Sequence, residues 1–381
     1  MEKYNASVVS CLDYDQATVA AAMDAAISAI DGLDWVKPGM RILIKANLVS
    51  AMKPEEAATT HPALVCELVK SLTALGAKAV IGDSPGGFFT VAALNHNYST
   101  TEMTRAEELG AELNRNVASK TVQIDGVAMK SLTYTSYIDD CDAMIDFCKL
   151  KSHGMVGMSG AVKNLYGVIP GMLKPETHYL YPDMNDFANM LVDINEHFKP
   201  RLTLVDAVVG MEGNGPTAGT PKKIGVLIAA RTTHAADLVA ARIIGLDPMD
   251  VPTIRAGIER KLIPADYREL PVCGNVEALS VRDFDVSAPK GVKFLGGTKF
   301  LITQRFIEAC FTNKPLPKKK LCIGCKKCAG LCPAHAITMV KGKPHIDRKK
   351  CIRCFCCQEF CPKAAMVVHR PLVARLLQRK R

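Results

Sequence analysis

The sequence lacks the segments that would direct a chain into a membrane. Its first ten residues carry no basic region followed by an apolar core, so we expect no signal peptide. The alanine-rich stretch 17–30 is interrupted by Asp24, and it is shorter than the roughly 20 apolar residues that span a bilayer. We therefore expect a cytoplasmic protein.

Nucleotide-binding fingerprints are also missing. The chain contains neither a G-x-G-x-x-G turn nor a Walker A loop, so its sequence supports no nucleotide site. No recognition motif with interleaved aromatic residues accompanies its basic residues, and we expect no specific nucleic-acid partner. With 381 residues, 48% hydrophobic and 23% charged, the chain has the composition of a globular protein with two or three domains.

Acidic residues are nearly absent from the C-terminal part. Residues 314–381 contain 18 Lys and Arg but only Asp347 and Glu359, giving +16, whereas the first 313 residues have a net charge of −6. A module this basic attracts acidic partners, and we expect an acidic redox protein among them. Docking of the module on its own acidic body is the alternative.

Two cysteine runs dominate this basic part. Each reads C-x2-C-x2-C-x3-C-P, beginning at Cys322 and at Cys351. Three thiolates in one tight loop and a fourth from a distance suit the corners of a 4Fe–4S cubane, and bacterial two-cluster ferredoxins use this run. Structural zinc would use C-x2-C pairs and leaves the third cysteine and the C-P of each copy unexplained.

The resemblance to two-cluster ferredoxins covers about residues 314–369 and implies two 4Fe–4S clusters. In that arrangement the last cysteine of each run ligates the other cluster. The expected sets are Cys322, Cys325, Cys328 and Cys361 for one cluster, and Cys351, Cys354, Cys357 and Cys332 for the other. Cys356 is left over, as a free thiol or as an exchange partner of Cys357.

The remaining cysteines are scattered in apolar contexts, where reduced buried thiols are the expected state. They are Cys11, Cys66, Cys141, Cys148, Cys273 and Cys310.

The first 300 residues alternate apolar runs with helical patterns, which indicates an α/β fold with a largely parallel sheet flanked by helices. We predict strands at residues 7–12, 40–48, 79–82, 143–148, 202–209 and 224–230, and helices at 15–30, 62–75, 186–198 and 233–244. A small α+β ferredoxin-like domain follows.

The predicted organisation is an α/β body at 1–313, a linker at 314–320, a two-cluster domain at 321–369 and a tail at 370–381. Prolines and lysines mark the linker. The tail places its leucines on one helical face with arginines off it. Such a tail packs on its own protein or contacts a membrane surface, and we favour the former.

Four polar strings follow predicted strands, where open α/β sheets bind ligands. They are K-A-N at 45–47 with T-T-H-P at 59–62, K-L-K-S-H at 149–153, S-G-A-V-K-N-L-Y-G at 159–167 with Lys174 and His178, and Asp206 with G-M-E-G-N-G-P at 210–216. Lysines beside histidine and asparagine suit binding of a carboxylate or phosphate and acid–base work. Capped helices and tight turns with solvated lysines are the alternative for each string.

If the body is catalytic, a reductive reaction is expected. The candidate residues are Lys45, Lys151, His153, Lys163 and Asn164, with Asp206 and Glu212 orienting the cations or binding a metal.

Together with Asp237, these strings resemble the prokaryotic family named domain of unknown function 362, over about residues 5–260. The strings K-N-L-Y-G and G-M-E-G-N-G-P are the most specific. Members often carry a C-terminal two-cluster module, so the resemblance implies an iron–sulfur protein but no particular reaction.

Two functions follow from the sequence. In one, the chain moves single electrons through its clusters, and the body binds a small anionic ligand or a partner and acts as an iron–sulfur oxidoreductase. In the other, it is a non-catalytic ferredoxin-type carrier or adaptor that docks on an acidic redox partner. A third, an assembly factor, is the least favoured.

Overall fold

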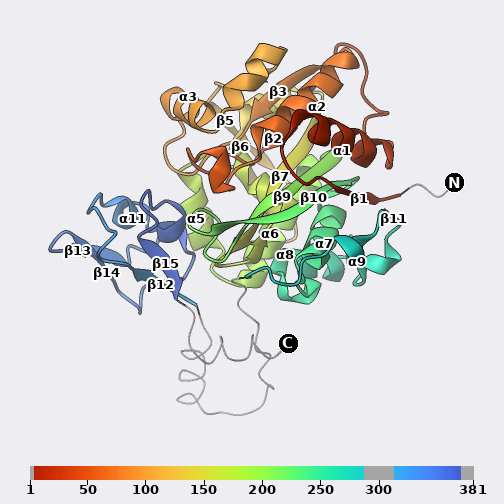
Figure 1. The fold of residues 1–381 in the computed structure, drawn as a ribbon. Coiled ribbons are helices and arrows are strands. Elements are labelled where there is room, and N and C mark those ends of the chain that lie inside the picture. The colour runs from red at the N-terminus through yellow and green to blue at the C-terminus, as the bar shows by residue number, and fades with distance from the viewer. Residues whose placement is uncertain (1–3, 287–312, 370–381) are drawn as a thin grey trace.

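The structure is a computed structural model that describes residues 4–286 and 313–369. A large sheet lies between helical layers, and a small cysteine-rich unit lies beside it (Figure 1). This confirms the expected α/β class with a small C-terminal domain. The predicted amphipathic tail at 370–381 and Cys310 lie outside the described residues.

In the described part of the chain, nine strands form one mixed sheet in the order β11-β1-β10-β9-β7-β2-β3-β4, with β8 on β7. Neighbours from β9 to β4 run parallel, whereas β10 is antiparallel to β1 and β9. The strands are β1 (Ala6–Ser10), β2 (Arg41–Ala46), β3 (Lys78–Gly82), β4 (Glu112–Leu113), β7 (Ala143–His153), β8 (Gly157–Ser159), β9 (Leu202–Glu212), β10 (Thr220–Ala230) and β11 (Val272–Cys273). A separate hairpin joins β5 (Ser119–Gln123) and β6 (Ser131–Thr135).

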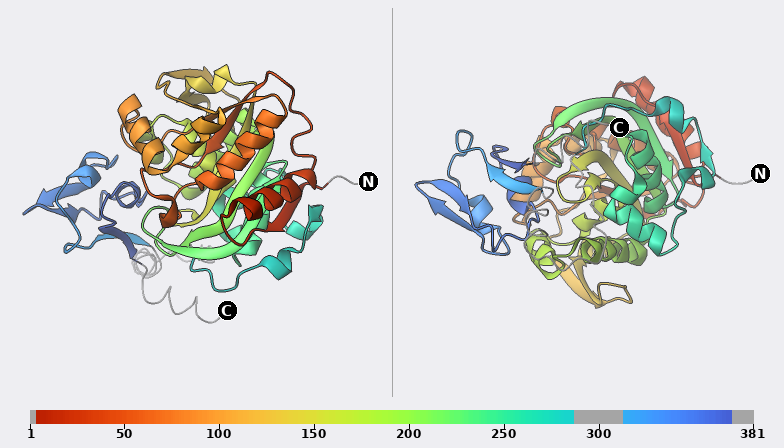
Figure 2. Two further views of the ribbon diagram at one scale, coloured as in Figure 1. Left: turned by 45° about the horizontal axis from the view of Figure 1, so that its top comes forward. Right: turned by 90° about the horizontal axis from the view of Figure 1, so that it is seen from below.

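Helices cover both faces of this sheet (Figure 2). Helices α1 (Gln16–Ser28), α2 (Pro62–Ala74) and α3 (Val91–Thr100) share a core with one face. The opposite face packs against α6 (Met184–Phe198) at one end and α7 (Thr233–Ile243) at the other. The remaining helices of the body are α4 (Ala161–Asn164), α5 (Leu173–Leu180), α8 (Pro252–Glu259) and α9 (Val276–Leu279), with short 3-10 turns η1 (Pro54–Glu56), η2 (Met103–Leu109), η3 (Ser136–Asp140), η4 (Leu165–Val168), η5 (Pro248–Asp250) and η6 (Tyr267–Glu269).

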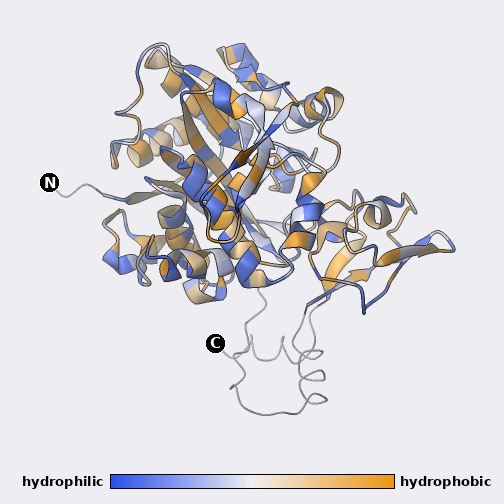
Figure 3. Cartoon of the chain, turned by 180° about the vertical axis from the view of Figure 1, so that it is seen from behind, coloured by the Kyte–Doolittle hydropathy of each residue, from blue (hydrophilic) through white to orange (hydrophobic). Residues whose placement is uncertain are grey.

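Strand alternation divides the core between these two layers. In β2, Ile42 and Ile44 join the core under α1 and α2, and Leu43 joins the core under α6. Successive side chains of a strand point to opposite faces, so this register fixes where the following polar residues point. Apolar segments concentrate along the strands inside the body (Figure 3).

Strand β7 is longer than expected. The sequence predicts that it ends at Cys148, but it continues to His153 and pairs there with β8. The string K-L-K-S-H therefore belongs to the strand rather than to a loop after it. In residues 4–286 and 313–369, no helix is both long and apolar enough to cross a bilayer.

The cysteine-rich unit contains two antiparallel strand pairs and two short helices. Strand β12 (Lys314–Pro317) pairs with β15 (Met366–His369), and β13 (Ile337–Val340) pairs with β14 (Lys343–Ile346). Helices α11 (Lys327–Gly330) and α12 (Cys356–Glu359) carry cysteines. The segment expected as a linker at 314–320 thus begins with a strand of this unit.

The second half of the unit packs on the body. Phe355 is buried in the body core under α6. Gln358 Nε2 donates to the Asn214 carbonyl at 2.8 Å, and the Val368 N–H donates to Asn214 Oδ1 at 2.9 Å. A Cβ on Gly86 would lie 1.7 Å from the Phe360 ring, so this glycine permits the close approach.

Candidate functional site

Lys45 is the innermost cation of the candidate site. It shares the α6-facing side of β2 with Leu43, and its side chain has no exposed surface. Its ammonium forms an ion pair with Asp83 Oδ1 at 2.8 Å and donates to the Ala46 carbonyl at 2.8 Å. A buried ammonium needs such partners because burial without them is costly.

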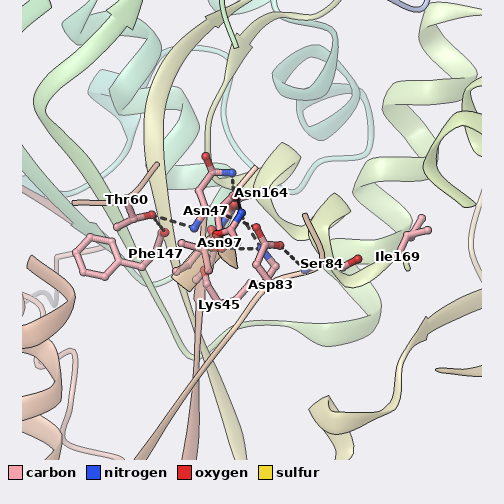
Figure 4. A network of polar contacts seen from close by, with 12 residues as sticks. Lys45, Asn47, Thr60, Asp83, Ser84, Asn97, Phe147, Asn164 and Ile169 are labelled. Atoms are coloured by element: carbon pink, nitrogen blue, oxygen red, sulfur yellow. Dashed lines mark hydrogen bonds and ion pairs between the residues drawn. The ribbon is translucent and has the colours of Figure 1, made fainter. Parts of the chain in front are cut away.

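Asp83 follows β3 and connects three segments (Figure 4). Its Oδ2 accepts from the Leu48 N–H at 2.7 Å, and its Oδ1 accepts from the Ser84 N–H at 2.8 Å as well as pairing with Lys45. A Cβ on Gly167 would lie 2.0 Å from this carboxylate. The last glycine of K-N-L-Y-G is therefore required by the ion pair.

Asn164, at the end of α4, organises the amide part of the site. Its Nδ2 donates to the Lys45 carbonyl at 3.0 Å and to Asp146 Oδ1 at 2.7 Å, and its Oδ1 accepts from Asn47 Nδ2 at 2.9 Å. Burial raises the pKa of Asp146 well above its ordinary value. Its Oδ2 has no hydrogen-bond partner among the described residues.

Two further lysines are buried beside this network. Lys151 Nζ donates to Asn47 Oδ1 at 2.6 Å and to the Ala58 carbonyl at 2.7 Å. Lys174 Nζ donates to the carbonyls of Ser84 at 2.6 Å and Ile169 at 2.5 Å. Burial lowers the pKa of Lys151 to about 7 and that of Lys174 to about 7.

The fourth lysine, Lys163, faces the cysteine-rich unit. Its ammonium lies 4.0 Å from Glu359 Oε1 and 5.5 Å from the centre of the Tyr166 ring. Within the described residues, no hydrogen bond from this ammonium is present. Its donors therefore remain available, in contrast to those of Lys45 and Lys174.

His153 ties the body to Glu359. Its Nδ1 accepts from the N–H groups of Met155 at 3.1 Å and Val156 at 3.2 Å, which places the ring proton on Nε2. Nε2 then donates to Glu359 Oε1 at 2.6 Å. Burial lowers the pKa of His153 to about 4, so the ring is neutral. Burial opposes ionisation of Glu359, but Lys163 and this hydrogen bond hold its pKa below the ordinary value.

Apart from Lys45, Asp146 and His153, these groups line one cavity between the body and the cysteine-rich unit. The volume of this cavity that is not filled by protein atoms, including its open mouth, is about 480 Å³. The body contributes Asn47, Asp83, Ser84, Lys151, Lys163, Asn164, Tyr166 and Lys174, and the cysteine-rich unit contributes Glu359 and Phe360. We call it the seam cavity. Lys45 lies directly behind it, against Asp83 and Asn164.

Asp206 and Glu212, expected in the same site, lie elsewhere. Asp206 pairs with Lys149 at 2.6 Å, and both are buried against Tyr14 on the α1 and α2 face. Tyr14 in turn stacks on His61. Glu212 is at the end of β9 and accepts from the Asp285 N–H. Strand alternation puts Lys149 on the face opposite to Lys45, which separates the two clusters.

Asp237, part of the family resemblance, supports the site from behind. Its carboxylate accepts from the N–H groups of Ala161 at 2.6 Å and Val162 at 3.1 Å, at the start of α4. A Cβ on Gly160 would lie 2.1 Å from it. The S-G-A-V-K-N string is thereby held so that Lys163 and Asn164 reach the cavity.

The two expected cysteine sets line two different cavities. One is lined by Cys322, Cys325, Cys328 and Cys361, with a non-atom volume of about 390 Å³. The other is lined by Cys332, Cys351, Cys354 and Cys357, together with Cys356, with a volume of about 330 Å³. Four thiolates around an apolar cavity fit an iron–sulfur cluster in donor chemistry. All described cysteines are free, and Cys141 and Cys273 are only half-buried.

Sequence reasoning missed two residues that line the seam cavity, Asp83 and Glu359, and one behind it, Asp146, which contacts Asn164. Asp83 follows a predicted strand in the string D-S-P-G-G, the same signal that identified the other strings. Asp146 is an acid within an apolar strand, which is itself a signal. Glu359 is one of only two acids in the basic part of the chain, and the cysteine pattern concealed it.

Comparisons with known proteins agree with this organisation. A family model described as domain of unknown function (DUF362) matches residues 42–242, and a 4Fe-4S dicluster domain matches residues 314–362. A thylakoid-associated protein of Synechocystis sp. is 31% identical over 252 residues, covering 66% of this chain and 77% of that protein.

Two solved structures are more distant. The lactate racemase apoprotein from Thermoanaerobacterium thermosaccharolyticum has a TM-score of 0.41 and 12% identity over 63% of this chain. A protein from Thermotoga maritima has a TM-score of 0.33 and 10% identity over 55% of this chain. The chain spans 57% and 54% of those two chains.

Because the first family model matches more than half of the chain and the second matches its cysteine-rich end, the chain belongs to the DUF362 family and is an iron–sulfur protein with a C-terminal 4Fe–4S dicluster domain.

Proposed function

We propose that this protein carries two 4Fe–4S clusters, transfers single electrons through them, and reduces a small anionic substrate in the seam cavity. The observation that carries the proposal is the lining of that cavity, which combines body lysines with Glu359 and Phe360. These two residues lie between Cys357 and Cys361 in the chain. A ligand there would lie beside the cysteine sets.

The proposed cluster ligands are the two sets that line separate cavities, with Cys356 beside the second. Cys356 is buried, and a neighbouring Cys354 thiolate together with burial raises its pKa well above the ordinary value. Burial raises the pKa of Cys357 in the same direction, so the C-x2-C-x2-C spacing rather than the pKa favours Cys357 over Cys356 as the ligand.

Lys163 is the proposed anchor for the substrate anion. Lys45 and Lys174 already use their ammonium donors on protein acceptors, as described above. Within residues 4–286 and 313–369, the Lys163 ammonium has its long contact with Glu359 and its position over the Tyr166 ring, but no hydrogen bond. A carboxylate or phosphate oxygen would therefore find free N–H donors on Lys163, in a partly desolvated site where charged hydrogen bonds are strong.

Lys151 is the proposed proton donor. Its pKa of about 7 matches the operating pH, which is the condition for efficient acid–base catalysis. A reduced one-electron carrier protein would supply two electrons, one at a time. Those electrons and two protons, one from Lys151 and one from solvent water, would saturate a polarised double bond of the substrate.

The test is ligand binding by the anaerobically purified protein and its Lys163→Ala variant. Mass spectrometry identifies any retained ligand, and calorimetry with oxalate and inorganic phosphate measures anion binding. We expect roughly 10- to 150-fold weaker anion binding for the variant, from the loss of one charge-assisted hydrogen bond of about 1.5–3 kcal/mol. Lys223→Ala, an exposed lysine on β10, is the matched control. Equal binding by both variants would refute the anchor.

The second candidate is the non-catalytic carrier. Lys45 pairs with Asp83, and Lys174 donates to the carbonyl of the next residue, Ser84. These contacts favour the carrier because they also suit a core that is purely structural. In that case neither variant alters electron transfer to a partner, and no ligand is retained.

A further inference from the structure

The side of the dicluster domain that faces away from the body differs from the side that contacts it. In Figure 1, α11, β13 and β14 lie away from the body. The contacting side buries Phe355 and engages Gln358 and Val368. The second cysteine set is accordingly the more buried, with Cys354 and Cys357 both under 9% exposed.

The outward side presents apolar residues around the first cysteine set. Ile323 is 62% exposed and Leu321 is 49% exposed, and Cys325 is exposed as well. Together with Lys326, Lys327 and Lys363, which line the same cavity or adjoin it, they form what we call the distal face: Leu321, Ile323, Cys325, Lys326, Lys327 and Lys363.

The distal face is held in shape by the β13–β14 hairpin. Lys343 Nζ donates to the Cys322 carbonyl at 2.6 Å. A Cβ on Gly324, which has φ of +72°, would lie 3.0 Å from the Gly342 carbonyl oxygen. The loop therefore presents its side chains from a fixed backbone rather than from a free segment.

The charge of this face has one sign. The only acids of residues 314–381 are Asp347 and Glu359. Glu359 is engaged by His153 at the body, and Asp347 does not line the cavity of the first cysteine set. An apolar centre with a cationic rim has the anatomy of a protein interface, and its charge complements an acidic partner.

We propose that the distal face is the docking surface for an acidic one-electron carrier protein, whose electrons enter at the first cysteine set and leave towards the seam cavity. The partner's reduced centre loses one electron and the dicluster domain gains it, with no bond made or broken. This inference rests on the proposed electron-transfer function and adds the direction and the partner. The body covers the opposite side, so the distal face is where Cys325 is accessible.

The test measures binding of the full-length holoprotein to a purified acidic flavodoxin by calorimetry. For Lys326→Glu with Lys327→Glu, we expect Kd to rise about tenfold or more at low ionic strength, with the difference shrinking as salt screens the charges. The control is Lys349→Glu with Lys350→Glu, which makes the same charge change at exposed positions outside the distal face. It should change Kd less than about threefold.

A second variant tests the apolar centre. Ile323→Asn should weaken binding at every salt concentration, since it removes buried apolar area rather than charge. Iron content verifies that each variant retains its domain. Equal losses in both charge-reversal pairs, or binding independent of salt, would overturn the proposal. So would tighter lysine-dependent binding to a DNA duplex or to anionic vesicles than to flavodoxin.

Failure here is distinguishable from failure of the proposed function. Lys163→Ala should bind flavodoxin like the parent protein, because Lys163 lies in the seam cavity and not on the distal face. Loss of anion binding in that variant, combined with charge-insensitive flavodoxin binding, would keep the reductive site and discard the docking surface.

Discussion

Replacing Asp83 with asparagine should destabilise the body severely. The substitution preserves shape but removes the charge that compensates the fully buried Lys45 ammonium. It also replaces one of the two oxygens that accept from Leu48, Ser84 and Lys45 with an amide nitrogen. Breaking a buried ion pair by removing one partner costs about 3–5 kcal/mol. That corresponds to a fall in Tm of roughly 6 °C or more.

Thermal unfolding followed by circular dichroism measures the effect. Glu112→Gln is the control, because Glu112 pairs with Arg41 at 3.1 Å but is 42% exposed. An exposed pair is worth about 1 kcal/mol or less. Adding Lys45→Met to Asp83→Asn should restore part of the loss, since no ammonium is then left uncompensated. Similar Tm values for the Asp83 and Glu112 variants would refute the assignment of Lys45–Asp83 as the buried centre of the site.

Two further predictions concern packing and pH. Gly86→Ala should push Phe360 aside and increase proteolysis between body and dicluster domain, whereas Gly330→Ala, which meets no atom within 4 Å, should not. His178 stacks on Phe187, its Nδ1 has no partner among the described residues, and burial lowers its pKa to about 3. Between pH 6.5 and about 3 the unfolded chain takes up a proton that the native site refuses, so stability falls on acidification. His178→Phe should flatten that fall in urea titrations, and an unchanged slope would contradict it.

Period-two and helical patterns were sufficient to predict the main strands and helices of the body. The predicted segments at 62–75 and 186–198 correspond closely to α2 and α6. Short pairings such as β8 with β7, and β12 with β15, were not predicted. They depend on contacts between segments, and two to four residues carry too little pattern to reveal them.

The sequence predicts most of the residues of the site, but not which of them lie together. Lys45, Lys151, Lys163 and Asn164 converge as expected from strings at strand ends. Lys149 and Asp206 separate from Lys45 because β7 continues through the string, and alternation then turns Lys149 to the other face of the sheet. Alternation alone would put Lys151 on the same face as Lys149, but the register of β7 against β9 shifts between these two residues. A register shift of one residue decides to which face of the sheet a lysine side chain points.

Glu359 could not be placed from sequence because its role is set by how the dicluster domain docks. Its contact with His153 joins residues 206 positions apart. Local sequence patterns carry no information about such a pairing. The sequence shows only that acidic residues are scarce in that region.

The most direct test of the account is the iron and sulfide content of the anaerobically purified protein, read together with EPR of the reduced state. We predict about eight iron and eight sulfide per chain, with signals from two interacting 4Fe–4S clusters. About four iron per chain, or zinc in place of iron, would contradict the assignment of the two cysteine sets and, with it, the electron path to the seam cavity.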